Sequence, residues 1–413
     1  MNKILYIATL LVSLLFIGCS KSNDEPSVPK DTTAVRTVIM YVVADNSIAA
    51  YLGKDVAELI QGVKASTVMT ENDHLVLMYN TASFSNVYDL TKAACDTLTT
   101  IKNLTPAYVI SQDENVCTKE VFGEVLNLVK TEFPAQSYSL VMESHGSGWV
   151  IDNSQTAAST KQRRSIGKDG SQTLDVTDLA EVLATPIRTD GKKNFDFIFF
   201  DACFMQGVEV CYQLRNVADY IVASPAEIPG DGAAYDKMVD CFFTEGEAGA
   251  TMVADQYYKT YVTATSGPLL SVVKTDALDA FADYMQGVVS SHHNEIIDTD
   301  YSEDNNYYCF GVTNLRHTYP DYNDIKKIMQ NVLTSDELQT FNQQLSKVIT
   351  SNPHSNAWLT IHYINSYGQT RNVVEESYSG MSMFIPFPKY DLYQKTWNTT
   401  YRQLDWGQKV WPE

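Results

Sequence analysis

A cysteine and a histidine that could act together each follow a run of residues typical of a buried strand. Phe195–Phe200 runs into Asp-Ala-Cys, ending at Cys203, and Tyr138–Ser144 runs into His145. The carboxyl ends of parallel strands lie at one edge of a sheet, where open α/β sheets bind ligands. If these strands are neighbours, thiol and imidazole meet there, as a cysteine nucleophile requires. Taken alone, a cysteine is more often a small buried hydrophobe.

The neighbouring residues favour a reactive sulfur at this edge. From Gln206 to Arg215, apolar and polar residues interleave at helical spacing. We therefore expect Cys203 to lie near a helix N-terminus, where backbone dipoles stabilise a thiolate. Gly146 and Gly148 let the backbone pass close to a ligand. Backbone N–H groups at such a site can hold an oxyanion.

The elements that must position these residues alternate between strand and helix. This alternation predicts an α/β fold with a parallel sheet and helices on both faces. Strands are expected at 35–43, 74–80, 138–144, 195–200 and 219–224, and helices at 48–63, 118–131, 175–184 and 276–293. Between the histidine and the cysteine, 151–173 is polar and predicts a long exposed loop, the kind of segment that proteases cut. Its basic residues are Lys161, Arg163, Arg164 and Lys168.

The first residues have the pattern of an export signal. Residues 1–18 combine a short positive start with an apolar stretch too short to span a membrane comfortably. They lead into Cys19 in a sequence that resembles a bacterial lipobox, and 19–34 is a polar tether. We expect lipidation at Cys19 and an outer-membrane lipoprotein, with the cell surface as one location. A plain secretory signal is the alternative.

Charge and cysteine content narrow the range of possible partners and site types. The 413 residues carry a net charge of −20, which argues against a nucleic-acid partner and favours cationic substrates. The six cysteines after Cys19 include no CxxC pair, so a zinc ribbon or redox dithiol is not indicated. We expect at most one disulfide, with Cys95 and Cys117 as the candidate pair.

The two strand ends, together with later motifs in the same order, resemble the clostripain family of caspase-like cysteine peptidases. The matching segments are 201–210, 223–232 and 378–386. The resemblance extends from about Val35 to the C-terminus. It implies a caspase–haemoglobinase-like, three-layer α/β/α sandwich with a mostly parallel central sheet. We expect the peptidase core at 35–293 and a smaller C-terminal α+β subdomain at 294–413 that completes the fold.

The same resemblance implies roles for individual residues. Cys203 would attack the scissile carbonyl, and His145 would protonate the leaving amine as the second member of a dyad. The backbone N–H groups of Gly146 and Cys203 would hold the oxyanion. Because the family cuts after Arg or Lys, Asp201 maps onto the acid of the S1 pocket, and Asp231 is a second candidate. Asp201 as a turn residue with no role in binding is the alternative.

The resemblance also implies self-activation by cleavage at a basic residue of the 151–173 loop. We expect no required cofactor; the acidic 298–304 segment leaves a calcium ion open. The partners are protein or peptide substrates with a basic P1 residue, and we expect a monomer, intact or nicked into two chains.

Two other classes of function compete with a peptidase: a catalytically silent caspase-like surface lipoprotein that binds peptides or host proteins, and a nutrient-binding lipoprotein. The nutrient-binding class would not explain the two strand ends.

Overall fold

The sheet is built from strands whose two faces are both apolar. In β1 (Ala34–Val43), Val38, Met40 and Val42 pack into one hydrophobic cluster, while the alternate residues Ile39 and Tyr41 pack into another. Successive side chains of a strand point to opposite faces, so this strand needs a layer of helices on each side. A computed structural model describes residues 34–149, 166–170, 172–264, 266–301, 307–308, 322–360, 369–392 and 396–411.

Nine strands of the described residues form one sheet, in the order β13-β10-β9-β8-β5-β1-β2-β3-β4. The five central strands, from β9 to β2, run parallel, whereas β3, β4, β10 and β13 are antiparallel to their neighbours. The remaining strands are β2 (His74–Thr81), β3 (Phe84–Asp89), β4 (Tyr108–Ile110), β5 (Ala135–Glu143), β8 (Phe195–Asp201), β9 (Ala218–Ala223), β10 (Ser271–Lys274) and β13 (Ile349–Ser351).

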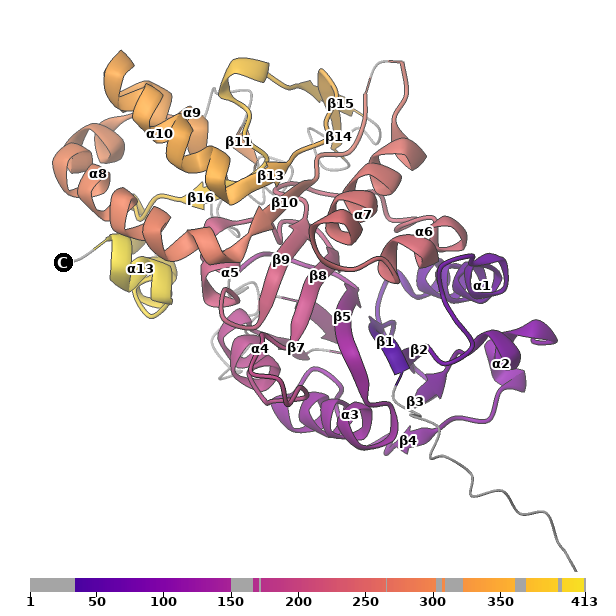
Figure 1. Ribbon diagram of the computed structural model, residues 1–413. Helices are drawn as coiled ribbons and strands as arrows, with labels where there is room; N and C mark the ends of the chain where they lie inside the picture. Colours follow the sequence, from indigo (N-terminus) through magenta and orange to yellow (C-terminus); the bar gives the residue numbers. More distant parts are fainter. Residues whose placement is uncertain are drawn as a thin grey trace, which may run out of the picture. The chain divides into compact units, whose positions relative to one another are not determined.

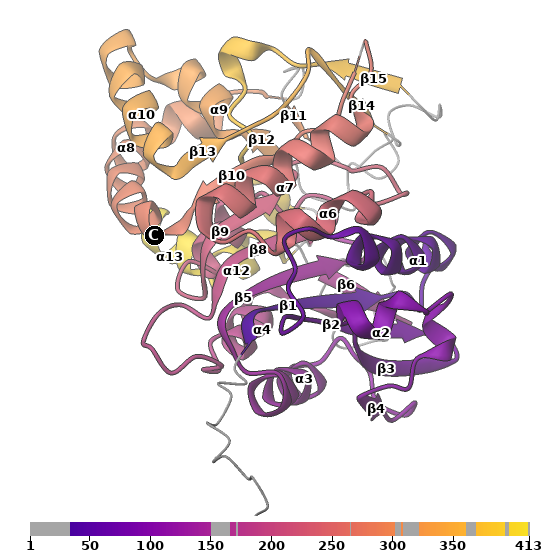
Figure 2. The ribbon, with the colours of Figure 1, turned by 45° about the vertical axis from the view of Figure 1, so that its right-hand side comes forward.

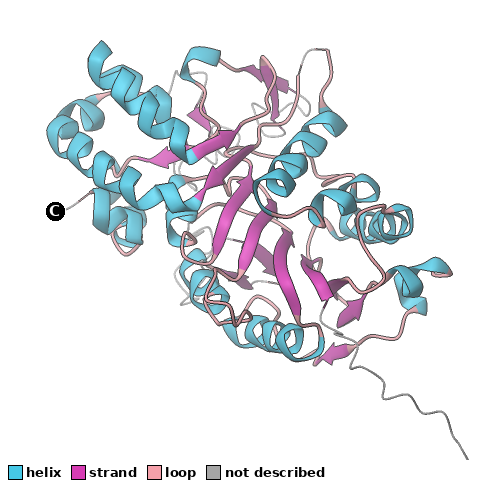
Figure 3. Ribbon diagram, in the orientation of Figure 1, coloured by secondary structure: helices cyan, strands magenta, loops and turns pink. Residues whose placement is uncertain are grey.

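Helices cover both faces of this sheet (Figure 1 and Figure 2). One face packs against α1 (Ala49–Ala65), α6 (Tyr235–Phe242) and α7 (Gly246–Tyr261). The other packs against α3 (Lys119–Glu132), α4 (Val176–Leu183), α5 (Val208–Gln213), α8 (Leu278–Asp298) and α13 (Asp405–Val410). The expected three-layer α/β/α architecture is therefore confirmed, with antiparallel strands at both edges of a parallel centre (Figure 3).

Smaller elements complete the described chain. The helices are α2 (Lys92–Asp96), α9 (Ile325–Val332), α10 (Ser335–Val348), α11 (Lys389–Leu392) and α12 (Trp397–Tyr401). The strands are β6 (Ile166–Asp169), β7 (Gln172–Leu174), β11 (Tyr307–Tyr308), β12 (Tyr322–Asp324), β14 (Ala357–Thr360), β15 (Gln369–Asn372) and β16 (Ser382–Phe384). No described helix is both long and apolar enough to cross a membrane.

Three expectations need correction. The boundary expected at 293/294 falls inside α8, and β13, from the expected C-terminal subdomain, extends the main sheet. The expected loop at 151–173 is not exposed throughout, because β6 and β7 form a hairpin in which Ile166 is buried. Cys95 and Cys117 are both buried free thiols rather than a disulfide pair. The export signal, Cys19, and the basic residues Lys161, Arg163 and Arg164 lie outside the described residues.

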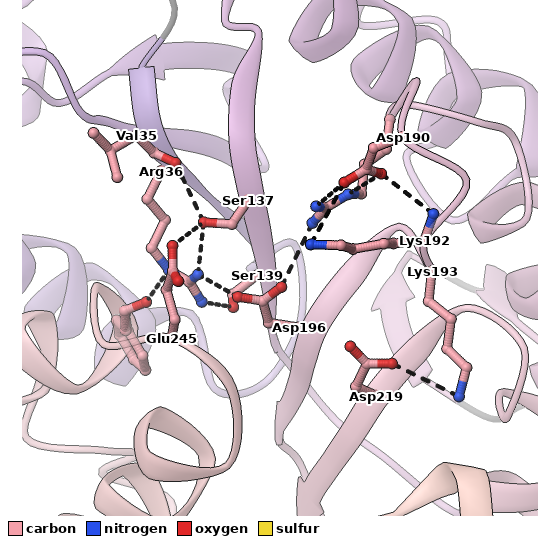
Figure 4. A network of polar contacts seen from close by, with 12 residues as sticks. Val35, Arg36, Ser137, Ser139, Asp190, Lys192, Lys193, Asp196, Asp219 and Glu245 are labelled. Atoms are coloured by element: carbon pink, nitrogen blue, oxygen red, sulfur yellow. Dashed lines mark hydrogen bonds and ion pairs between the residues drawn. The ribbon is translucent and has the colours of Figure 1, made fainter.

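Toward the amino-terminal ends of the strands, a buried arginine joins several elements (Figure 4). Arg36 is 1% exposed; its guanidinium donates to Asp196 at 2.6 Å, to Ser137 at 3.0 Å and to Ser139. Its Nε donates to the carbonyl of Phe242 at 2.8 Å. A buried cation is tolerated only when its donors are paired in this way. Arg36 thus fixes β1, β5 and β8 relative to α6.

Replacing Arg36 by methionine keeps most of the side-chain volume but leaves Asp196 without this partner. We expect a loss of about 3 kcal/mol in the free energy of unfolding, the cost of breaking a buried pair from one side. Denaturant unfolding measures it. The matched control is Arg402→Met, the same change at an exposed arginine, which should leave the midpoint nearly unchanged. Equal midpoints for the two variants would contradict this role.

Candidate active site

The register of two central strands brings the histidine and the cysteine together. β5 and β8 are parallel neighbours, and Glu143 pairs with Asp201 at their carboxyl ends. His145 and Cys203 each follow two residues later. Because the offset is the same on both strands, both side chains emerge at one place on the sheet edge. From β1 the sheet grows in one direction through β2 and in the other through β5, so this place adjoins the topological switch point, where α/β sheets bind ligands.

The two strand-end segments touch through their backbones. A methyl group on Gly146 would lie 2.6 Å from the carbonyl oxygen of Cys203 and 2.9 Å from the side chain of Ala202. Those distances are closer than van der Waals contact, so only glycine fits at this position. The two N–H groups expected to hold an oxyanion, those of Gly146 and Cys203, therefore belong to segments in direct contact.

Cys203 lies in a strained turn rather than at a helix N-terminus. Phe204 has a φ of +60°, uncommon for a bulky residue, and α5 begins only at Val208. The turn is fixed by backbone bonds from Phe204 N–H to the carbonyl of Ala226 and from Gln206 N–H to that of Ser224. Backbone strain of this kind clusters at functional sites, where the surrounding structure enforces it. The expectation of a helix dipole at Cys203 was wrong.

The surroundings of Cys203 favour the neutral thiol. The pKa of Cys203 is raised to about 12, chiefly by desolvation and in smaller part by the carboxylates of Glu227 and Asp201. The N–H of Ile228, which donates to Sγ at 3.5 Å, acts in the opposite direction. Because the thiolate is the nucleophile, this arrangement describes a resting state whose sulfur must lose a proton before it reacts.

His145 has a contact that sequence reasoning missed. Its Nε2 lies 2.9 Å from the hydroxyl of Ser47, in the turn that follows β1. The histidine carbonyl accepts from the N–H of Gly167, so the β6–β7 hairpin is tied to the same residue. The only sequence signal for Ser47 was its place after a buried strand at the same sheet edge. Lys168 lies in this hairpin, within β6.

A pocket of about 210 Å³ opens beside the sulfur. His145 and Cys203 line it, together with Gly146 and residues of the loop after β9, among them Glu227, Ile228 and Gly232. Two carboxylates from the strand ends, Glu143 and Asp201, also line it. Asp201 thus lines the same pocket as His145 and Cys203. Asp231 is exposed and is not among the residues that line the pocket, although its neighbours Gly230 and Gly232 are.

Asp201 belongs to a group of three buried acids, here called the carboxylate cluster: Asp55, Glu143 and Asp201. A Cβ atom added to Gly232 would lie 3.1 Å from a carboxyl oxygen of each of the three acids. Asp201 Oδ2 accepts from Tyr235 Oη at 2.8 Å and from the N–H of Ala233 at 2.7 Å. Burial raises the pKa of Asp201 to about 6, and burial also raises the pKa of the other two. Sequence reasoning missed Asp55 and Glu143.

Within the described part of the chain, no cluster of three or more His, Cys, Asp or Glu side chains is arranged to hold a metal ion.

The fold and the site together define a class of protein: a cysteine-dependent hydrolase of the caspase-like α/β type, with a nucleophile and a histidine at the switch point of the sheet. In such a site the pocket beside the sulfur receives one side chain of the substrate.

Comparison with known proteins agrees with this class. A model of the clostripain family matches residues 40–413, so the chain belongs to the clostripain family of cysteine proteases. Clostripain of Hathewaya histolytica is 23% identical over 450 residues, which cover 95% of this chain and 81% of the relative. The protein is therefore a clostripain-like cysteine peptidase that acts on peptide substrates.

Two solved structures are similar along nearly their whole length. One is a secreted C11 cysteine protease from Bacteroides thetaiotaomicron in complex with an irreversible peptide inhibitor; it is 26% identical, with a TM-score of 0.70, and the match covers 91% of this chain and 99% of that one. The other is an inactive zymogen of a C11 protease from Parabacteroides distasonis, 24% identical, with a TM-score of 0.73 and coverage of 93% and 99%. The second likeness supports the fold alone.

The backbone contact at Gly146 predicts the effect of one methyl group. In Gly146→Ala, the new Cβ must push the Cys203 carbonyl away, which displaces both candidate oxyanion donors. Removing one such donor costs about 10²–10³-fold in kcat, so we expect at least about a hundredfold loss with a normal KM. Steady-state kinetics measures it. Gly287→Ala in α8, where no atom lies within 4 Å of the new methyl, is the control and should keep full activity.

Proposed function

We propose that this peptidase cleaves after Arg or Lys by a dyad of Cys203 and His145. The observation that carries the proposal is the state of Asp201. Its Oδ2 is held by Tyr235 and Ala233, whereas its buried Oδ1 has no partner at hydrogen-bond distance among the described residues; the Tyr257 hydroxyl lies near enough to the carboxyl to lower its pKa. An unpaired carboxylate oxygen beside the catalytic sulfur is costly unless a donor arrives. A guanidinium or ammonium group of the substrate supplies that donor.

The proposed reaction uses only groups at the strand ends. The thiol of Cys203 gives its proton to His145, and Sγ attacks the scissile carbonyl. The N–H groups of Gly146 and Cys203 bind the oxyanion. The imidazolium of His145 then protonates the leaving amine as the C–N bond breaks, which leaves a thioester on Cys203. A water molecule, deprotonated by His145, hydrolyses the thioester and restores the thiol. Ser47 orients the imidazole through its 2.9 Å contact with Nε2.

Fluorogenic peptides that differ only at P1 test this specificity. We expect turnover with Arg or Lys and almost none with Asp or Asn. In Asp201→Asn the loss of the pocket charge should lower kcat/KM for the Arg peptide by about 30-fold or more, the ~2 kcal/mol typical of truncating a buried charge pair. Assays with and without calcium, and with and without a reductant, show whether activity needs either one, separately from the P1 preference. If no peptide is turned over and iodoacetamide does not label Cys203, the binding lipoprotein becomes the better hypothesis.

We propose that the chain activates itself by cutting between His145 and Cys203. Lys161, Arg163 and Arg164 are the favoured sites. Lys168 is disfavoured, because β6 pairs with β7 and Gly146 forms a bridge with Ile166, so this backbone would have to unpair to enter an active site. The resting thiol of Cys203, with its raised pKa, suits a precursor.

Intact mass of the purified chain tests self-processing. The wild-type protein should separate into two fragments under denaturing conditions, with the cut after 161, 163 or 164, whereas Cys203→Ala should stay whole. A variant with all three basic residues replaced by alanine should also stay whole while its Cys203 remains intact. Identical single chains from wild type and Cys203→Ala would exclude self-processing, and a cut after Lys168 would reassign the site.

We also propose that Cys19 carries a lipid that anchors the protein at the outer membrane. The support is the lipobox-like sequence that ends at Cys19 and the polar tether that follows it. Cells grown with an alkyne fatty acid should yield labelled wild-type protein in the membrane fraction and unlabelled Cys19→Ser protein outside it. Equal membrane association of the two would argue against the anchor.

A further inference from the structure

The carboxylate cluster contains more acid than one P1 cation needs. Its members come from three elements: Asp55 from α1, Glu143 from the end of β5 and Asp201 from the end of β8. All three are at most 3% exposed. One oxygen of each lies 3.1 Å from the same point, the Cβ position of Gly232, so no two of these oxygens are farther apart than twice that distance.

Within the described chain, Glu143 is the member of the cluster that combines two unpaired carboxyl oxygens with a place in the pocket wall. Apart from their contact with each other, the carboxyls of Glu143 and Asp55 have no hydrogen-bond partner among the described residues. Glu143 lines the pocket together with Asp201, whereas Asp55 is not among the lining residues and contacts Glu143 from α1. Glu143 is therefore the second carboxylate that a cation in the pocket would meet.

Three buried carboxylates this close together cannot all be ionised, because each charge opposes the next in a region without solvent. We propose that Glu143 binds the P1 cation beside Asp201, and that the proton which Glu143 shares with Asp55 leaves to solvent when that cation enters. The P1 side chain stays protonated throughout. Its positive charge therefore replaces the positive charge of the proton that leaves Glu143 and Asp55. This inference rests on the proposed preference for Arg or Lys and names further residues that create it.

The role of Asp55 is that of a positioning residue. Burial raises the pKa of Glu143 most, and Asp201 and the contact with Asp55 raise it as well; burial raises the pKa of Asp55 to about 7. At low pH the cluster is protonated and a cation gains little from it; as the pH rises through about 6 to 7, the acids ionise and the cation binds more strongly. The preference for Arg over a neutral P1 residue should therefore increase with pH.

Other groups around the cluster could also titrate and must be controlled. Lys54 and Glu58 face it from α1, and Tyr79 from β2. Tyr235, Tyr257 and Tyr261 face it from α6 and α7, and burial raises the pKa of each above the ordinary value. Asp231, Glu227, Cys203 and His145 adjoin it from the loops. A matched substrate pair, with Arg or citrulline at P1, cancels titrations that affect both substrates equally, such as those of Cys203 and His145 in the chemical steps, so the ratio reports the groups that act on the P1 charge.

The experiment measures kcat/KM for the Arg and citrulline peptides from about pH 5 to 8 and follows their ratio. In the wild type, the ratio should rise with pH. In Glu143→Gln, whose amide can donate to Asp55, we expect at least a tenfold lower ratio at about pH 7.5. In Asp55→Asn, which removes the repulsion but leaves Glu143, the ratio at high pH should be retained within about threefold, and its rise should move to lower pH by about one unit. A merely structural role for Asp55 would not move the profile.

The outcomes separate this inference from the proposed function. A wild type that shows no preference for Arg over citrulline contradicts the proposed specificity itself. Suppose instead that the wild type clearly prefers Arg, that Asp201→Asn abolishes this preference, and that Glu143→Gln changes neither its size nor its pH dependence. This result would overturn the role of Glu143 and leave the proposed specificity standing. Thermal unfolding of each variant confirms that the fold is intact. If Glu143→Gln does not fold, the shift or constancy of the Asp55→Asn profile decides the matter.

Discussion

The site depends on one register, the pairing of Glu143 with Asp201 between β5 and β8. The paired residues place two carboxylates side by side at the strand ends, and His145 and Cys203 follow each of them by the same two positions. Recognition and chemistry are therefore set by a single alignment of hydrogen-bonded strands. A slip of β8 by one residue would turn its own side chains, including Asp201, to the face of the sheet opposite Glu143. The Arg36 network, toward the other end of the same strands, helps to hold that alignment.

Asp201, one of the acids that would bind a cation, also disfavours the thiolate form of the nucleophile. Burial raises the pKa of Cys203, and the carboxylates of Glu227 and Asp201 contribute, so the empty site favours the inactive thiol. A positive P1 side chain in the pocket would offset part of this negative charge and lower the pKa of the thiol. Substrate binding and thiolate formation would then be coupled through electrostatics. Such coupling suits a protease whose sulfur should stay unreactive until a cleavable chain is in place.

Sequence patterns were sufficient for the parts of the molecule that follow periodicity. The apolar runs at 138–144 and 195–200 predicted buried parallel strands, and their ends located His145, Cys203 and Asp201. Asp55 and Glu143 were not found, because one is one of two acids on an otherwise ordinary amphipathic helix and the other lies within the residues of an expected strand. Only tertiary packing brings them to Asp201. The strained turn at Phe204 and the hairpin at 166–174 were missed for a similar reason: their conformations are imposed by contacts with distant loops.

The most direct test of the site is covalent labelling by a peptidyl chloromethylketone with Arg at P1, followed by mass mapping of the adduct. The analogue with citrulline at P1 has nearly the same shape without the charge. The adduct should form on Cys203, at least about ten times faster with Arg than with citrulline, as a buried carboxylate pocket requires. Labelling of a different residue, or equal rates for the two reagents at Cys203, would contradict the assignment of the nucleophile or of its acidic pocket.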